Sequence, residues 1–264
     1  MSPLIFFGSS PFSLIVLQKL ISHVVTVVTT PDKPIGRHLK LTPNPVKLLA
    51  QKHQISIIEK LEPWTLNLEP SVIGLVAAYG RIIPQTILDK FSNQIYNIHP
   101  SLLPKYRGPS PLQQQILDGV TQTGVTIIKI DNQMDHGPIV AVAHDTIHPD
   151  DTTQTLGERL FAKGADLFLD LFSNSPLPFP SLSQREGPEV SYTKKITRAD
   201  GFVPFEKFKN YLEFRISDLE FERKFRAFSP WPGIWSTNPK GKRVKLISLH
   251  PLLVQFEGQK PRPW

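Results

Sequence analysis

Three polar side chains in two short segments could together carry out acyl transfer to an amine. Asn97 supplies a carboxamide and His99 an imidazole in the run Asn-Ile-His-Pro-Ser-Leu-Leu-Pro, and Asp135 supplies a carboxylate farther along the chain. Acyl transfer passes through a tetrahedral oxyanion that needs a hydrogen-bond donor, and the proton of the amine needs an acceptor. An asparagine amide can donate, and an imidazole with an unperturbed pKa near ~6.5 can move protons at neutral pH. Asp135 would orient that imidazole, and His99 could act either as the base or as a second oxyanion donor.

The residues around this trio favour a catalytic interpretation. An Asn-x-His at a strand end is by itself more often a capping or turn element. Here a double-leucine turn, the pair Arg107-Gly108 and then Asp135 follow it. A metal site formed by His99, Asp135 and His136 is disfavoured, because adjacent side chains diverge in a regular strand and no third ligand follows at a metal-binding spacing. We therefore expect no metal.

The elements that must position these groups are predicted to form one sheet. Short apolar, β-branched segments predict seven strands at residues 4–7, 24–29, 55–59, 72–77, 94–98, 125–130 and 139–144. Helix-length patterns separate several of them, at residues 12–21, 46–52, 85–91 and 112–118. This alternation predicts an α/β fold with a Rossmann-like, doubly wound, mostly parallel sheet and a site at the carboxyl ends of its strands. The last two strands, joined only by the loop that holds Asp135, are predicted to be antiparallel.

The composition indicates a globular protein without disulfides. Its 264 residues are 40% hydrophobic and include no cysteine, which excludes thiolate chemistry and fits a reducing compartment. No apolar run approaches the ~18 residues of a membrane span, and the first residues lack a basic leader. The single glycine in Gly8-Ser9-Ser10-Pro11 excludes the dinucleotide fingerprint and hence NAD binding. We expect a cytoplasmic, monomeric protein that makes no membrane contact.

Basic charge is concentrated in the C-terminal part. Residues 1–189 contain 15 Lys+Arg and 16 Asp+Glu, whereas residues 190–264 contain 15 and 7, so the two net charges are −1 and +8 and sum to +7. A segment this cationic suggests a polyanionic partner such as a nucleic acid. Solubility, or contact with an anionic membrane surface, is the alternative explanation.

The motif residues, from Asn97 through Arg107 and Gly108 to Asp135, resemble the signature of the folate-dependent formyltransferase family, and the similarity extends from about residue 6 to residue 245. The flanking segments are similar to those of the members that act on methionyl-tRNA. The resemblance implies the formyltransferase fold and transfer of a formyl group from 10-formyltetrahydrofolate to the amino group of initiator methionyl-tRNA, for translation initiation. It also implies that Asn97, His99 and Asp135 are the catalytic residues. One departure is His136, which stands where the family usually has threonine.

The resemblance implies two segments for folate binding. Residues 77–84 resemble the family segment that contacts the pterin, and Gly80 would allow close backbone approach there. The double-leucine turn is the second segment. The expected folate contacts are Ala78, Tyr79, Gly80, Ile82, Pro84, Ser101, Leu102, Leu103 and Pro104. A simple turn before the helix that starts at Pro84 is the alternative for the first segment.

Residues 30–47 are predicted to form an exposed loop, because they contain four prolines and show no apolar periodicity. In the tRNA-specific members a loop of this length binds the acceptor end, which implies that role for Arg37. After that arginine, where the family often has Gly-Lys-Lys, this chain has His-Leu-Lys, so we expect weakened but retained acceptor binding. The expected tRNA contacts are Arg37, Lys40, Arg107 and Gly108. A solvated proline-rich connection is the alternative.

We expect a formyltransferase catalytic domain at residues 1–175, a linker at 176–190 and a basic C-terminal domain at 191–264. The latter is predicted to be helical over 205–228, followed by a hairpin of 234–237 with 243–248 and one short strand at 252–257. Only 32 residues run from Gly233 to Trp264, too few for the closed barrel that family members carry, so we expect an internal deletion and a reduced, β-rich domain. Two other functions stay open: a formyltransferase for a small amine, such as an amino sugar nucleotide or glycinamide ribonucleotide, and a non-catalytic RNA-binding remnant.

Overall fold

The computed structural model describes residues 2–35, 40–62, 65–66, 68, 72–92, 94–174, 179, 189–214 and 218–264. The chain divides into two compact units. The first comprises Met1–Gly108, Gln122–Thr146 and Gly157–Tyr192, and the second comprises Pro109–Thr121, Ile147–Leu156 and Thr193–Trp264. None of the helices in the described ranges has the length and apolar character needed to cross a membrane.

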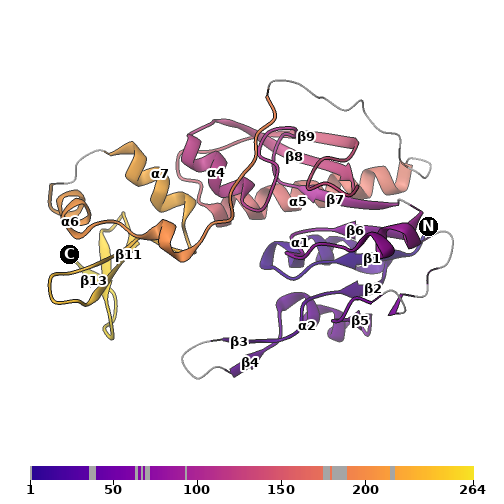
Figure 1. Cartoon of the computed structure of the whole chain (residues 1–264), viewed down its shortest axis with the longest axis horizontal. Coiled ribbons are helices and arrows are strands. Elements are labelled where there is room, and N and C mark those ends of the chain that lie inside the picture. Colours follow the sequence, from indigo (N-terminus) through magenta and orange to yellow (C-terminus); the bar gives the residue numbers. More distant parts are fainter. Residues whose placement is uncertain are drawn as a thin grey trace. The chain divides into compact units, whose positions relative to one another are not determined.

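The first unit is built on a seven-stranded sheet in the order β5-β2-β1-β6-β7-β8-β9 (Figure 1). Its strands are β1 (Leu4–Phe7), β2 (Val24–Val28), β5 (Ser56–Ile58), β6 (Ile73–Val76), β7 (Ile95–His99), β8 (Gln122–Lys129) and β9 (Ile139–Thr146). The strands from β5 to β7 are parallel, and β8 is antiparallel to both of its neighbours. The predicted sheet of seven mostly parallel strands is confirmed, as is the antiparallel pairing of the last two.

Local sequence signals start helices α1 and α2 of this unit within one residue of the predicted positions. Helix α1 (Pro11–Leu20) starts at a proline, and the Ser10 side chain accepts a hydrogen bond from the Ser13 N–H. Helix α2 (Pro45–Lys52) repeats this arrangement, with Asn44 as the capping residue. Such a cap stabilises a helix by about 1 kcal/mol, because it satisfies an N–H that has no partner inside the helix. Helix α3 (Gln85–Leu88) continues into a 3-10 turn, Asp89–Phe91.

The long helix α5 (Thr153–Asn174) packs on one face of the sheet and thereby determines which residues of β7 can form a site. A Cβ atom at Gly164 would collide with the Ile98 side chain, so helix and strand approach closely at this glycine. Tyr96 also faces α5, with its ring centre 6.4 Å from that of Phe168. Because side chains alternate along a strand, Asn97 and His99 project together from the opposite face.

The prediction of a loop without regular elements at residues 30–47 was wrong for parts of the segment. Residues Lys33–Ile35 (β3) and Lys40–Thr42 (β4) pair as a two-stranded antiparallel ribbon in which Pro34 lies opposite Leu41. A proline is tolerated in such an edge ribbon because its missing N–H removes no bond from a sheet interior. The segment that contains Arg37 lies outside the described residues.

The second unit combines short helices with a four-stranded antiparallel sheet in the order β10-β11-β12-β13. Its elements are α4 (Pro111–Asp118), a 3-10 turn (Arg198–Gly201), α6 (Phe205–Phe214), α7 (Leu219–Ala227), β10 (Trp235–Thr237), β11 (Arg243–Ser248), β12 (Leu253–Phe256) and β13 (Arg262–Pro263). The predicted helical region, the hairpin and the following strand are found. The two-residue strand β13 was not predicted, because Arg-Pro carries no apolar pattern.

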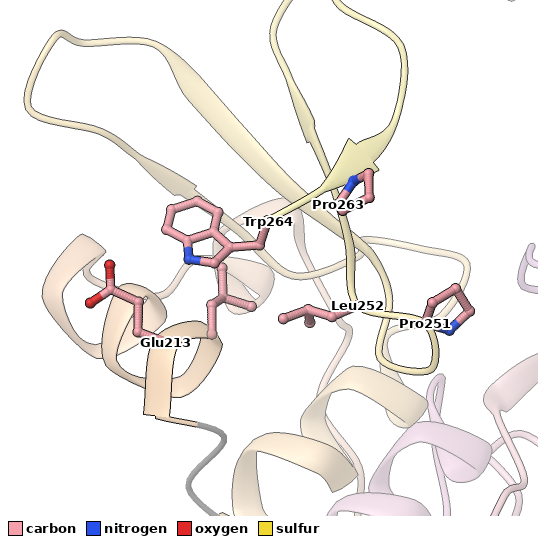
Figure 2. Close-up of a pocket in the computed structure, with 6 residues that line it drawn as sticks. Glu213, Pro251, Leu252, Pro263 and Trp264 are labelled. Carbon is pink, nitrogen blue, oxygen red and sulfur yellow. The ribbon is translucent and has the colours of Figure 1, made fainter.

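A cavity of about 460 Å³ opens in the second unit beside α6 (Figure 2). Figure 2 shows the Trp264 ring near Glu213, with Leu252 and Pro251 farther along the same opening. None of the residues predicted for the catalytic or folate site lines this cavity. Asn97, His99 and Asp135, the predicted catalytic trio, all lie in the first unit.

Candidate active site

The three predicted catalytic side chains meet at one carboxylate oxygen. The Asn97 Nδ2 atom donates a hydrogen bond of 3.2 Å to Asp135 Oδ1, and His99 Nδ1 lies 3.5 Å from that same oxygen. The other oxygen, Oδ2, accepts a 2.8 Å hydrogen bond from the Gly108 N–H. The His99 side chain is only 4% exposed and that of Asp135 12%, so water screens their interaction weakly.

Asp135 reaches this place because the β8–β9 loop folds back over β7. Strand β8 ends with Lys129 paired opposite Tyr96, near the beginning of β7, yet the Asp135 carboxylate contacts Asn97 and His99 farther along that strand. Asp135 has a left-handed backbone, with φ of 51°. Asp and Asn adopt this conformation more readily than most side chains. The loop is therefore shaped to present Asp135 rather than to connect the strands by the shortest path.

The other edge of the His99 ring is held by backbone. His99 Nε2 lies 3.0 Å from the Tyr106 carbonyl oxygen, an acceptor, which assigns a proton to Nε2. The Nδ1 edge is then the one on the side of Asn97 and Asp135. With Nδ1 unprotonated the ring can accept a proton there, and with Nδ1 protonated it can donate toward the carboxylate. The geometry accommodates both roles that the sequence left open for His99.

Hydrogen bonds with Thr126 of β8 hold the double-leucine turn in place. The Thr126 hydroxyl donates to the Ser101 carbonyl at 2.7 Å and accepts from the Leu103 N–H at 3.2 Å, while the buried Ser101 hydroxyl donates to the Lys105 carbonyl at 2.8 Å. Leu103 is buried, whereas Leu102 and Pro104 are partly exposed. The side chain of Ser101 thus closes the turn that carries the other expected folate contacts.

The second expected folate segment lies beside the end of β7. Val76 pairs with Asn97, so the turn that follows β6 begins next to that residue. Ala78 and Gly80 have positive φ values of 45° and 74°, and the Ser13 hydroxyl donates to the Ala77 carbonyl at 2.6 Å. The side chain of Ile82 is 84% exposed.

Tyr79 and Pro84 complete this segment. Tyr79 is buried, and burial raises the pKa of its phenol, an effect that Arg81 opposes. Its ring packs edge-on against Phe7, with 5.9 Å between the ring centres. Pro84 is exposed and immediately precedes α3. Tyr79 therefore anchors the turn in the core, and the backbone of the turn lies at the end of the sheet.

Among the residues expected to contact tRNA, Arg107 and Gly108 lie at the site. Arg107 is only 8% exposed, and one of its Nη atoms donates a hydrogen bond of 3.3 Å to the Tyr192 hydroxyl, while Nε has no hydrogen-bond partner among the described residues. The Arg107 N–H also donates to the Ser191 carbonyl at 2.9 Å. Lys40 begins β4, and Arg37 lies outside the described residues.

Some residues that shape the site were not predicted as part of it. Ser191 and Tyr192 border Arg107, and Asp131 binds His136 in the loop that holds Asp135. Their partners lie elsewhere in the chain or depend on the shape of a turn, so residue types alone do not indicate them. Within the described residues no cluster of three His, Cys, Asp or Glu side chains is arranged to hold a metal ion.

Comparison with known proteins identifies relatives of this arrangement. The formyl transferase family model matches residues 13–171. Methionyl-tRNA formyltransferase of Dehalococcoides mccartyi is 35% identical over 259 residues, which cover 94% of this chain and 79% of that protein. Methionyl-tRNA formyltransferase of Thermus thermophilus is 37% identical over 254 residues, covering 93% and 79%.

Solved structures share the fold. WlaRD, a sugar 3N-formyl transferase determined with dTDP and 5-N-formyl-THF, has a TM-score of 0.65 at 22% identity. The matched region covers 94% of this chain and 87% of the WlaRD chain. Phosphoribosylglycinamide formyltransferase from Bacillus halodurans has a TM-score of 0.53 at 25% identity, and 67% of this chain covers 98% of it. The matched family model, the two curated relatives and the converging trio lead to one conclusion: this chain belongs to the formyl transferase family.

Proposed function

We propose that this protein transfers a formyl group from 10-formyltetrahydrofolate to the amino group of initiator methionyl-tRNA. The observation that carries the proposal is the convergence of Asn97 and His99 on one oxygen of Asp135, in a place that is nearly closed to water. Two relatives that are 35% and 37% identical to this chain over 94% and 93% of its length are methionyl-tRNA formyltransferases, which supports methionyl-tRNA as the acceptor.

The geometry supports a direct transfer. The methionyl amine attacks the formyl carbon, and the carbonyl oxygen becomes an oxyanion. One N–H of the Asn97 amide binds Asp135 and the second is available to that oxyanion. His99 takes the amine proton at Nδ1, and the Asp135 carboxylate stabilises the imidazolium that results. Collapse of the intermediate breaks the bond to the folate nitrogen, which leaves as tetrahydrofolate after accepting a proton from His99.

The two turns beside β7 are the proposed folate site. The turn that follows β6 begins next to Asn97, and its backbone groups at Gly80 can pair with the edge of a pterin ring. The exposed Ile82 side chain offers an apolar surface that a bound folate could cover. The backbone of the double-leucine turn, held by Thr126, supplies the other side.

The acceptor end of tRNA is proposed to be bound by Arg37 and Lys40 and, at the site, by Arg107 and Gly108. The buried Arg107 guanidinium supports this role: no carboxylate among the described residues pairs with it, and such a cation favours an anionic ligand such as a phosphate. The excess of basic residues at 190–264 would add an electrostatic contribution that does not depend on sequence. We further propose that the protein is cytoplasmic and that it is a monomer. Light scattering would test the monomeric state.

The test is transfer of labelled formyl from 10-formyltetrahydrofolate to charged initiator methionyl-tRNA, with uncharged tRNA as the blank. We expect label on charged tRNA only, and its loss in His99→Ala. His144→Ala is the matched control, since His144 is an exposed residue of β9 in the same sheet. Label that persists in His99→Ala would contradict the proposed site.

Two further measurements separate this proposal from its alternatives. Turnover on tRNA should fall steeply between about 50 and 200 mM salt, whereas a small amine acceptor should respond little. Arg37→Ala should raise KM for tRNA and leave folate binding unchanged, and a loss confined to folate would contradict the role of Arg37. Folate binding without transfer to tRNA would favour a small amine, and an unaltered His99→Ala variant would favour a non-catalytic RNA-binding protein.

A further inference from the structure

A second carboxylate and imidazole meet inside the loop that presents Asp135. His136 Nδ1 lies 2.8 Å from Asp131 Oδ2, and Asp131 Oδ1 accepts a 2.9 Å hydrogen bond from the Gln133 N–H. Both oxygens of one carboxylate therefore bind residues of the same short loop. The two side chains are 24% and 30% exposed, so the pair lies at the protein surface rather than in the core.

The two contacts of Asp131 close the loop around Asp135. The contact with Gln133 spans two residues and the contact with His136 spans five, and Asp135 lies within the longer span. Asp135 needs such support because its left-handed backbone, with φ of 51°, is a conformation of higher energy for a residue with a side chain. At the far end of the loop, a Cβ atom at Gly137 would collide with the Lys129 carbonyl, which limits how the chain can return to β9.

We infer that His136 and Asp131 form a positioning pair that holds the Asp135 carboxylate toward Asn97 and His99. The inference rests on the proposed function for the role of Asp135. In the turn that they share, the Asp135 side chain contacts Asn97 while the His136 side chain contacts Asp131. The hydrogen bonds of the His136 and Asp131 side chains join these residues to each other and to Gln133, so their effect on the reaction passes through the backbone of residue 135.

A merely structural ion pair would behave differently. A partly exposed pair of this kind adds little to stability, and breaking it would leave the turnover of folded enzyme unchanged. A positioning pair instead changes kcat, because a carboxylate displaced from His99 supports the transition state less well. Measuring kcat and KM of folded variants therefore separates the two explanations, because only loss of a positioning pair lowers kcat.

The experiment compares His136→Ala, His136→Asn and Asp131→Asn with the wild-type chain. We expect kcat to fall about tenfold in His136→Ala, with both KM values unchanged, because a hydrogen bond to a charged group is lost. His136→Asn should recover most of the activity, since its Nδ2 can occupy the place of the imidazole Nδ1 and donate to Asp131. Asp131→Asn should lose activity with His136 still present, because the amide offers only one accepting atom.

A double variant and a control complete the design. If the two residues act as one unit, the variant lacking both should be no slower than the slower single variant. His144→Ala should retain full activity. Unchanged kcat in both His136→Ala and Asp131→Asn, additive losses in the double variant, or a loss confined to KM would each overturn the inference.

A crystal structure of His136→Ala tests the inference without reference to the acceptor. We expect the Asp135 carboxylate to leave its 3.2 Å contact with Asn97 in that variant. Retention of the contact would overturn the positioning role even if a small amine proved to be the substrate. A wild-type enzyme that transfers formyl to a small amine instead of tRNA would contradict only the proposed function, and the variants would then be assayed with that amine.

Discussion

Replacement of Asp135 by asparagine should lower kcat about 10³-fold and leave KM for both substrates within about twofold. The carboxylate lies 3.5 Å from His99 Nδ1, in a place where its side chain is only 12% exposed. At an effective dielectric constant of about 20, its attraction for a protonated imidazole at that distance is about 4–5 kcal/mol. Each ~1.4 kcal/mol of lost transition-state stabilisation lowers the rate tenfold, which gives the expected magnitude. Asparagine tolerates the left-handed backbone of residue 135, so the loop should keep its shape.

The assay is single-turnover transfer of labelled formyl at saturating folate and charged tRNA, with thermal unfolding recorded for each variant. Asp166→Asn is the matched control, because Asp166 is a 61% exposed carboxylate in the same unit whose partner is the surface residue Lys19. That variant should transfer formyl at the wild-type rate. A kcat of Asp135→Asn within about threefold of the wild-type value, or a loss found only in KM, would refute the electrostatic role assigned to Asp135.

Three further outcomes are expected. Gly164→Ala should lower the free energy of unfolding by about 1–3 kcal/mol in chemical denaturation, because the new methyl group overlaps Ile98, and an unchanged midpoint would contradict the close helix–strand contact. Burial is the largest single effect on Asp145 and raises its pKa, but the hydrogen bonds from Lys163 and the Thr146 N–H, with the charges of Lys163 and Arg159, together outweigh burial and hold the pKa below its usual 3.8. The stabilisation is present above about pH 4 and is lost as the pH falls through the lowered pKa, so Asp145→Asn should be less stable than wild type at pH 7, by a margin that shrinks on acidification. Arg107→Met should raise KM for tRNA about tenfold without lowering the melting temperature, whereas a destabilised variant with normal KM would assign Arg107 a structural role.

The sheet was predictable because its strands carry their own signals. Residues Leu4–Phe7 are all buried, and parallel strands covered on both faces consist of continuous apolar runs of this kind. The starts of α1 and α2 were predictable for an equally local reason, since a capping side chain followed by proline stabilises the first turn directly. Where neighbouring residues decide the structure, the sequence is sufficient.

Contacts between distant residues were not predictable in the same way. The Tyr106 N–H donates to the Ser191 hydroxyl across 85 positions, and the backbone of residue 106 in turn holds the His99 ring. The ribbon of β3 and β4 was missed because its strands have three residues each and include Pro34, so neither alternation nor length marks them. These contacts depend on the finished fold, and a pattern along the chain does not encode their partners.

His136 shows how a departure from a family motif acquires meaning only from geometry. The sequence argument against a shared metal ion at Asp135 and His136 assumed a regular strand, whereas the two residues lie in a turn whose geometry gives their side chains different partners. Asp135 binds Asn97, and His136 binds Asp131 at 2.8 Å. Threonine, the residue that the family usually has at this position, also carries a hydrogen-bond donor. A donor toward Asp131, rather than an imidazole as such, is therefore what the loop requires, and His136→Thr should retain more activity than His136→Ala.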